Sequence, residues 1–148
     1  MINLPENLID KAFDENTRQG AVIYYVNLKL KVEVKNKFLI LLNSDCNQRD
    51  IYFFLTTSQT KFYISHRKLR NYFVFIPENS VPFFPLPTLI DCRNPFCLSR
   101  NKLREKYGSR ELSFKGMLPE QFMDKLIKII RDSILISPKI KKSILGAQ

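Results

Sequence analysis

This chain of 148 residues is 45% apolar and carries 24 lysines and arginines against 14 aspartates and glutamates, for a net charge of +10. The length suits one domain with a buried core. The charge favours a polyanion such as nucleic acid as the partner, with solubility alone as the alternative. No apolar run reaches the roughly 18–20 residues that cross a bilayer, and the first residues lack the pattern of a secretion signal. We therefore expect a cytoplasmic protein that makes no membrane contact.

The cysteines argue against a disulfide framework, because Cys46, Cys92 and Cys97 are odd in number and irregular in spacing. Two of them could in principle bind zinc together with the single histidine, His66, but no CxxC pair or second histidine completes a ligand set. We expect buried, reduced thiols, and neither a metal nor another cofactor.

The N-terminal part predicts one helix and one strand. Pro5 suits the first turn of a helix over residues 5–13, whose apolar residues share one face. We expect residues 1–19 to form a helical appendage on the domain. Gly20 then opens a run over residues 21–28, and its β-branched and aromatic residues predict the first strand.

Residues 29–37 alternate strictly between apolar and mostly basic side chains, with Leu30, Val32 and Val34 at the apolar positions. A period of two predicts a strand or a hairpin arm with one buried face and one lysine-rich face in solvent. This basic face is either an edge protected by charge or an arm that contacts phosphates.

Residues 37–43 and 51–58 are two short apolar runs joined by a polar turn, and they predict neighbouring strands. Because neither run alternates, both faces of each strand are expected to be covered, which places the pair at the centre of the sheet. Polar chemistry is then expected at the strand ends, which carry Asn36, Lys37, Thr56, Thr57 and Ser58.

The middle of the chain predicts further short strands at residues 61–66 and 72–76, separated by a basic cluster of Arg67, Lys68 and Arg70. Prolines in residues 77–88 end the second of these strands, and apolar side chains anchor the segment as an ordered loop over the core. Residues 88–92 and 96–98 predict two more short strands.

The last third of the chain is mostly helical. Ser99 can cap a short basic helix that runs to Tyr107 and ends at Gly108. A strand at residues 111–115 follows, and apolar spacings of three and four predict a long helix over residues 119–134. Residues 137–148 are expected to hold a short final helix.

This order of elements predicts an α+β fold, namely a small and strongly bent antiparallel barrel with helices packed against it. No internal repeat divides the chain, so residues 1–148 are expected to form a single domain.

The order of GAVIYYVNL, NKFLILLN, IYFFLTTS and ELSFKG, followed by a long C-terminal helix, resembles the PemK/MazF family of toxin endoribonucleases over residues 20–136. The resemblance implies an SH3-like barrel that is usually dimeric. It also implies metal-independent cleavage of single-stranded RNA by 2′-hydroxyl attack, and inhibition by a cognate antitoxin.

Metal-independent cleavage needs a base, an acid for the leaving oxygen, and donors that stabilise the extra negative charge. The family supplies much of this from an arginine that enters the second strand and a Thr or Ser that ends the third. Here Asn36-Lys37 stands where the family typically has Arg-Pro, while Thr57 and Ser58 match the second position. A lysine neutralises a phosphate but lacks the planar fork of an arginine. The alternative role for these hydroxyls is local backbone bonding at a strand end.

His66 is the only histidine available for proton transfer near neutral pH, and a solvent-facing histidine at a strand end is the alternative. The candidate RNA-binding residues are Arg67, Lys68, Arg70, Arg100 and Arg104. For the basic helix, phosphate contact competes with an ordinary solvated face.

Motifs of P-loop enzymes, dinucleotide enzymes and general hydrolases are absent from the sequence. Two main hypotheses remain. The first is a toxin-like endoribonuclease, or mRNA interferase, of a toxin-antitoxin system, with single-stranded RNA, an antitoxin and a second copy of itself as partners. The second is a catalytically inactive RNA- or protein-binding module of the same fold. A structural protein of a mobile element is a third hypothesis.

Overall fold

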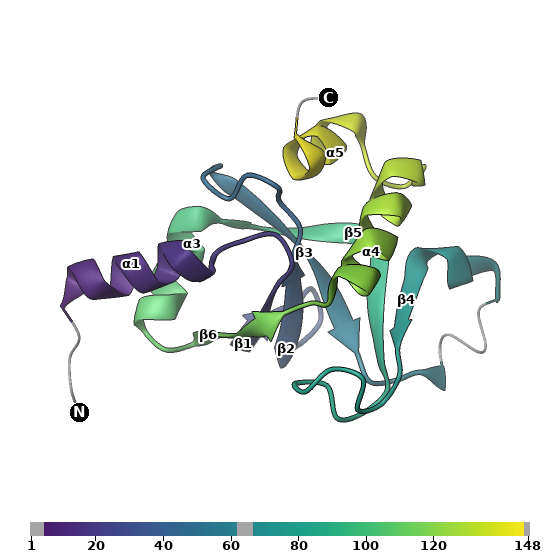
Figure 1. The fold of residues 1–148 in the computed structure, drawn as a ribbon, viewed down its shortest axis with the longest axis horizontal. Helices are drawn as coiled ribbons and strands as arrows, with labels where there is room; N and C mark the ends of the chain where they lie inside the picture. The colour runs from purple at the N-terminus through teal and green to yellow at the C-terminus, as the bar shows by residue number, and fades with distance from the viewer. Residues whose placement is uncertain (1–4, 62–66, 147–148) are drawn as a thin grey trace.

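The computed structural model describes residues 5–61 and 67–146 and shows an α+β fold, as predicted (Figure 1). Six strands form one antiparallel sheet in the order β4-β5-β3-β2-β1-β6, and this sheet curls into a half-barrel. In chain order the elements are α1 (Glu6–Asn16), β1 (Ala21–Lys29), β2 (Val34–Leu41), β3 (Asp50–Thr57), the 3₁₀ helix η1 (Arg67–Tyr72), β4 (Phe73–Ile76), β5 (Thr88–Ser99), α3 (Arg100–Gly108), β6 (Leu112–Met117), α4 (Glu120–Asp132) and α5 (Pro138–Leu145).

Strands β2 and β3 lie at the centre of the sheet, which confirms the prediction from their two-sided apolar character. Leu41 pairs with Phe53 and packs on one face, while Ile40 pairs with Phe54 and packs on the other. Both faces are buried because each is covered by helices. The ends of these two strands are therefore the first places where polar side chains can reach solvent.

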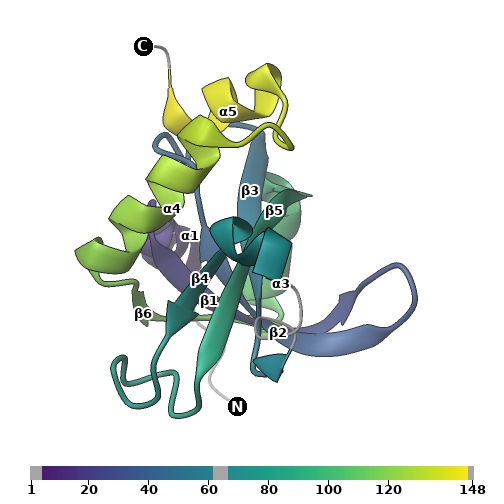
Figure 2. The ribbon, with the colours of Figure 1, turned by 90° about the vertical axis from the view of Figure 1, so that its right-hand side faces the viewer.

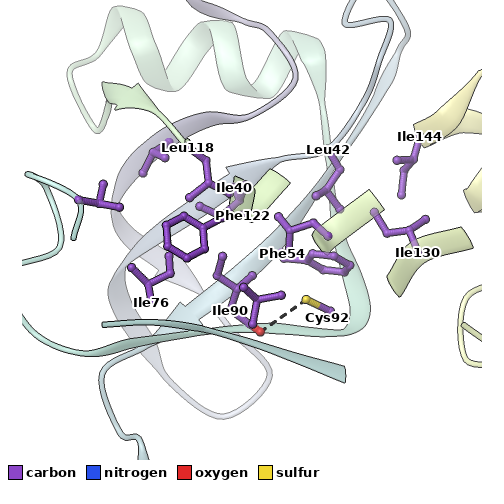
Figure 3. Close-up of a cluster of buried hydrophobic side chains, with 14 of the residues drawn as sticks. Ile40, Leu42, Phe54, Ile76, Ile90, Cys92, Leu118, Phe122, Ile130 and Ile144 are labelled. Carbon is purple, nitrogen blue, oxygen red and sulfur yellow. Dashed lines mark hydrogen bonds between the residues drawn. The ribbon is translucent and has the colours of Figure 1, made fainter. Parts of the chain in front are cut away.

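Helices α4 and α5 cover one face of the sheet. Apolar residues spaced by four along α4, Phe122, Leu126 and Ile130, pack into a cluster with Ile40 and Phe54 (Figure 3). This spacing places the three side chains on one side of the helix, so the amphipathic pattern predicted the buried face correctly.

Helices α1 and α3 cover the opposite face, where Phe13 and Leu103 pack with Ile23 and Leu39. Figure 1 shows α1 alongside α3, at the far side of the sheet from α4. As predicted, Ser99 caps α3, and its hydroxyl oxygen accepts a hydrogen bond of 3.1 Å from the backbone N–H of Lys102.

The prediction of one long helix through residue 134 is wrong in its last turn. Helix α4 ends at Asp132 because Ser133 takes an extended conformation and its hydroxyl accepts a hydrogen bond from the N–H of Leu135. Ile134, expected on the buried face, is 89% exposed. A separate helix, α5, follows as predicted and starts at Pro138.

Residues 88–92 and 96–98 form one strand, β5, where the sequence predicted two. The pairing with β3 shifts between Phe53 and Leu55, which leaves residues 92–95 of β5 as a bulge that ends at Pro95. Strand β4 pairs with β5 only from Thr88 to Asp91. Pro95 is tolerated because the hydrogen-bond ladder between β5 and β3 is interrupted at the bulge, and because β4 does not pair with β5 at this position.

The alternation in residues 29–37 correctly predicted a hairpin arm, but most of its apolar face is not buried. Residues 30–33 form the tip between β1 and β2, closed by a hydrogen bond of 2.8 Å from the N–H of Leu30 to the carbonyl of Glu33, and Leu30 is partly buried. Val32 is 93% exposed and Val34 is 57% exposed. Figure 2 shows the hairpin projecting beyond the helices, so no layer is available to cover it.

The thiols follow the prediction only in part, since Cys92 is buried but Cys97 is exposed on β5. Within residues 5–61 and 67–146, no helix has the length and apolar character needed to cross a membrane.

Candidate functional site

The structure brings Lys37, Thr57 and Ser58 together in one groove, because β2 and β3 run antiparallel. Leu39 of β2 and Leu55 of β3 are the last residues that pair at this end of the two strands, and Lys37 and Thr57 each lie two residues beyond them. The groove has a volume of about 580 Å³. Its lining residues are Tyr24, Glu33, Lys35, Asn36, Lys37, Phe38, Thr56, Thr57, Ser58, Gln59, Phe83, Phe84, Pro85, Leu86 and Thr88. We call it the first groove.

The ammonium group of Lys37 is half-buried in the first groove and donates a hydrogen bond of 3.3 Å to the carbonyl oxygen of Thr56. Burial lowers the pKa of Lys37, the nearby charge of Lys35 lowers this pKa further, and Glu33 opposes the shift. Glu33 itself pairs with Lys35 at 3.4 Å. A partly desolvated cation attracts a phosphate more strongly than an exposed one, because the local dielectric constant is lower.

The three hydroxyl groups at the end of β3 differ in their availability. Thr56 is buried, and its hydroxyl donates to the carbonyl of Phe38 at 3.0 Å, so its role is structural. Thr57 accepts a hydrogen bond of 3.1 Å from the N–H of Gln59, which still leaves its own O–H as a donor. Ser58 is exposed. Local backbone bonding therefore engages the hydroxyls of both Thr56 and Thr57, but it leaves the O–H groups of Thr57 and Ser58 able to donate to a ligand.

A row of aromatic rings lines the first groove beside Lys37. Ring centroids lie 4.8 Å apart for Tyr24 and Phe38, 5.2 Å for Phe38 and Phe84, and 4.9 Å for Phe84 and Phe83. The ammonium of Lys115 lies 5.8 Å from the Tyr24 ring. Phe84 is buried, whereas Tyr24, Phe38 and Phe83 are partly exposed, and partly exposed rings beside cations suit the stacking of unpaired nucleobases. Sequence reasoning missed the row because its members are far apart in the chain.

The loop over residues 77–88 forms one wall of the first groove and is held in place at two points. Val81 and Phe84 are buried and form an isolated β-bridge, as the apolar anchors of the loop predicted. Phe83 rests on Gly116 of β6, where a Cβ atom would lie 2.8 Å from the ring. The absence of a side chain at Gly116 therefore lets the loop close against the sheet.

None of the other predicted residues whose side chains the structure describes lines the first groove. His66 falls outside the described residues, as does the side chain of Arg67, whose backbone begins η1. Lys68 is exposed on η1, and Arg70 lines a different groove beside α4.

Arg100 and Arg104 of α3, predicted to contact RNA, form ion pairs with the acidic side of α1. Arg100 pairs with Asp14 at 2.5 Å, and Arg104 pairs with Asp10 and with Glu6, the latter at 3.2 Å. These carboxylates neutralise the cations, so a phosphate would have to displace an internal partner to bind at α3.

The ion pair between Arg104 and Asp10 is expected to contribute about 1 kcal/mol or less to stability, because Asp10 is exposed and water screens the pair. A double-mutant cycle with Arg104→Ala and Asp10→Ala, measured by urea unfolding, checks this value. A coupling energy above about 2 kcal/mol would contradict it.

Among residues 5–61 and 67–146, no group of three or more His, Cys, Asp or Glu side chains is arranged to hold a metal ion. No protein-family model matches the chain, and a search of curated proteins finds no match. The resemblance to PemK/MazF toxins therefore stays a prediction. Fold and groove together define an α+β domain with a cation, two hydroxyls and a row of rings at one end of its central strands.

Proposed function

We propose that this protein binds single-stranded RNA in the first groove and cleaves it as a toxin-like endoribonuclease of a toxin-antitoxin system. The observation that supports this proposal best is the meeting of the Lys37 ammonium with the Thr57 and Ser58 hydroxyls in one open groove. All three residues line this groove, and their side chains carry N–H or O–H donors for a phosphodiester. The aromatic row offers surfaces for the bases on either side of that phosphate.

The proposed reaction is attack of an RNA 2′-hydroxyl on the neighbouring phosphorus, which expels the 5′-oxygen and leaves a 2′,3′-cyclic phosphate. The Lys37 ammonium and the Thr57 hydroxyl stabilise the extra negative charge on the phosphate oxygens. The carboxylate of Glu33 also lines the groove and is a candidate base for the 2′-hydroxyl proton. The expelled 5′-oxygen takes up a proton from water in the open groove, and His66 remains the other candidate for proton transfer.

Labelled single-stranded RNA incubated with the protein in EDTA tests this proposal. We expect products that end in a 2′,3′-cyclic phosphate, and we expect Thr57→Ala to slow their formation by about 10²-fold, because one donor to the developing charge is lost. Ser109→Ala removes an exposed hydroxyl at the C-terminal end of α3, outside the first groove, and serves as the matched control. Equal rates for the two variants would contradict the role of Thr57.

A catalytically inactive RNA-binding module is the second candidate function. It is favoured by the hydrogen bond from Lys37 to Thr56, which occupies one donor of a side chain that already lacks the fork of an arginine. RNA binding without cleavage in the same assay would select this module. A cognate antitoxin and a homodimer remain part of the toxin proposal, and co-expression with any neighbouring acidic protein tests the former.

A further inference from the structure

A second groove, with a volume of about 620 Å³, lies between strand β4, the end of η1 and helix α4. Its cationic lining residues are Arg70 from η1 and Lys125 and Lys128 from α4. Among the residues that the structure describes, no carboxylate lines it. This second groove therefore presents a positive surface, whereas the first groove mixes Lys35 and Lys37 with Glu33.

The cations of α4 are available to a ligand. Lys125 and Lys128 are three residues apart, so they are neighbours on the exposed side of the helix, next to its buried face. The Lys125 ammonium lies 5.7 Å from the Phe122 ring centroid. Within residues 5–61 and 67–146, neither lysine forms an ion pair. Phosphate contact would therefore not have to displace an internal partner.

The second groove also offers an aromatic surface and amide groups. Phe75 of edge strand β4 is 40% exposed and lies at the rim of this groove, because its neighbours Val74 and Ile76 point to the other face of the strand, into the cluster beneath α4. Asn71 and Gln121 line the same groove. A ring, two amides and three cations match a nucleotide, since the base stacks on the ring, its edge meets the amides and its phosphate meets the lysines.

The two grooves are neighbours along the loop of residues 77–88. Pro77 and Ser80 line the second groove, while Phe83 and Leu86 line the first. Ser80 and Phe83 are three residues apart, so the backbone between them spans at most about 11 Å. A nucleic-acid strand of several nucleotides can therefore pass over the loop from one groove to the other.

We infer that the second groove binds the continuation of the same RNA strand, a few nucleotides away from the phosphate held at Lys37. This inference rests on the proposed RNA binding at the first groove. It assigns the second groove to the part of the RNA that flanks the phosphate held at Lys37. It does not require cleavage. Its consequence is that affinity grows with RNA length until both grooves are filled.

The test uses fluorescence anisotropy with 2′-O-methyl RNA oligonucleotides, which cannot be cleaved by 2′-hydroxyl attack, of about 4 and about 12 nucleotides. The longer oligonucleotide is expected to bind the unmodified protein at least tenfold more tightly. Lys125→Glu/Lys128→Glu is expected to remove this gain and to leave binding of the shorter one within about twofold. Phe75→Ala is expected to weaken only the longer one, by about fivefold or more.

The matched control is Lys139→Glu/Lys142→Glu on α5, which changes the net charge by the same amount at exposed lysines outside both grooves. Binding of the longer oligonucleotide is expected to fall clearly less in the control than in the α4 variant. The slope of log affinity against log salt is expected to drop by about 1 to 2 in the α4 variant only.

Equal affinities for the two lengths, or equal effects of the α4 variant and the control, would overturn the inference while leaving the first groove intact. Polyglutamate that binds through Lys125 and Lys128 without competing with RNA would also overturn it and assign the groove to an acidic peptide. Failure of the protein to bind either oligonucleotide at low salt would refute the proposed function itself. Binding without cleavage of unmodified RNA would refute only the catalytic step.

Discussion

Replacing Phe54 with alanine is expected to lower the free energy of unfolding by about 3–5 kcal/mol. Phe54 lies on β3 at 0% exposure, and its ring packs among Ile40, Ile90 and the buried side of α4 (Figure 3). Truncation removes a ring from a site that is closed on all sides by strands and a helix. The surrounding side chains cannot collapse fully into the space, so the cost of a cavity adds to the lost burial.

Urea unfolding followed by circular dichroism measures this loss, and an unchanged dependence on urea would show that the folded state keeps its compactness. Phe75→Ala is the matched control, because it deletes the same ring from an edge strand where the side chain is 40% exposed. We expect the control to lose less than half as much stability. Equal losses would mean that the layer formed by α4 does not enclose Phe54.

Replacing Lys37 with methionine is expected to slow RNA cleavage by at least about 10²-fold, the usual cost of removing a group that stabilises developing charge. Methionine keeps an unbranched side chain but cannot neutralise a phosphate. The effect should exceed that of an exposed lysine because Lys37 is half-buried, in a setting where charge is less screened. Initial cleavage rates in EDTA measure it.

Lys29→Met is the control for this prediction, since it removes the same charge from an exposed position on β1 outside the first groove. The control is expected to cleave within about threefold of the unmodified protein. If both variants lost activity equally, the net charge of the protein rather than the placement of Lys37 would be responsible.

Lys37→Arg tests the effect of pH on the positive charge at this position, because an arginine keeps its charge at a pH where the lysine loses it. Burial, followed by the charge of Lys35, lowers the pKa of Lys37, so the fraction of protonated Lys37 falls at a lower pH than for an exposed lysine. Contact with the phosphate should therefore weaken as pH rises through this lowered pKa. An arginine stays protonated and adds a planar fork, so the variant is expected to lose this pH dependence and to keep the affinity.

Local signals in the sequence were sufficient to predict the position of most helices and strands. Ser99 predicted where α3 starts, because a cap satisfies backbone groups only a few residues away, and the structure shows Ser137 capping α5 in the same way. The paired apolar runs around Leu41 and Phe53 predicted the central strands, since burial on both faces requires apolar residues at successive positions. The candidate groove at Lys37 and Thr57 followed from these strands, because antiparallel neighbours bring the start of one beside the end of the next.

The sequence by itself determined the α+β class, the central position of β2 and β3, and the strand ends at which Lys37 and Thr57 meet. Only the tertiary structure decided the rest, because it depends on contacts between residues distant in the chain. The carboxylates of α1 neutralise Arg100 and Arg104 across more than 80 residues, and Gly116 admits Phe83 to build the wall of the first groove. Val32 is likewise exposed because no helix covers the hairpin tip, and an alternating pattern buries a face only where another layer packs against it.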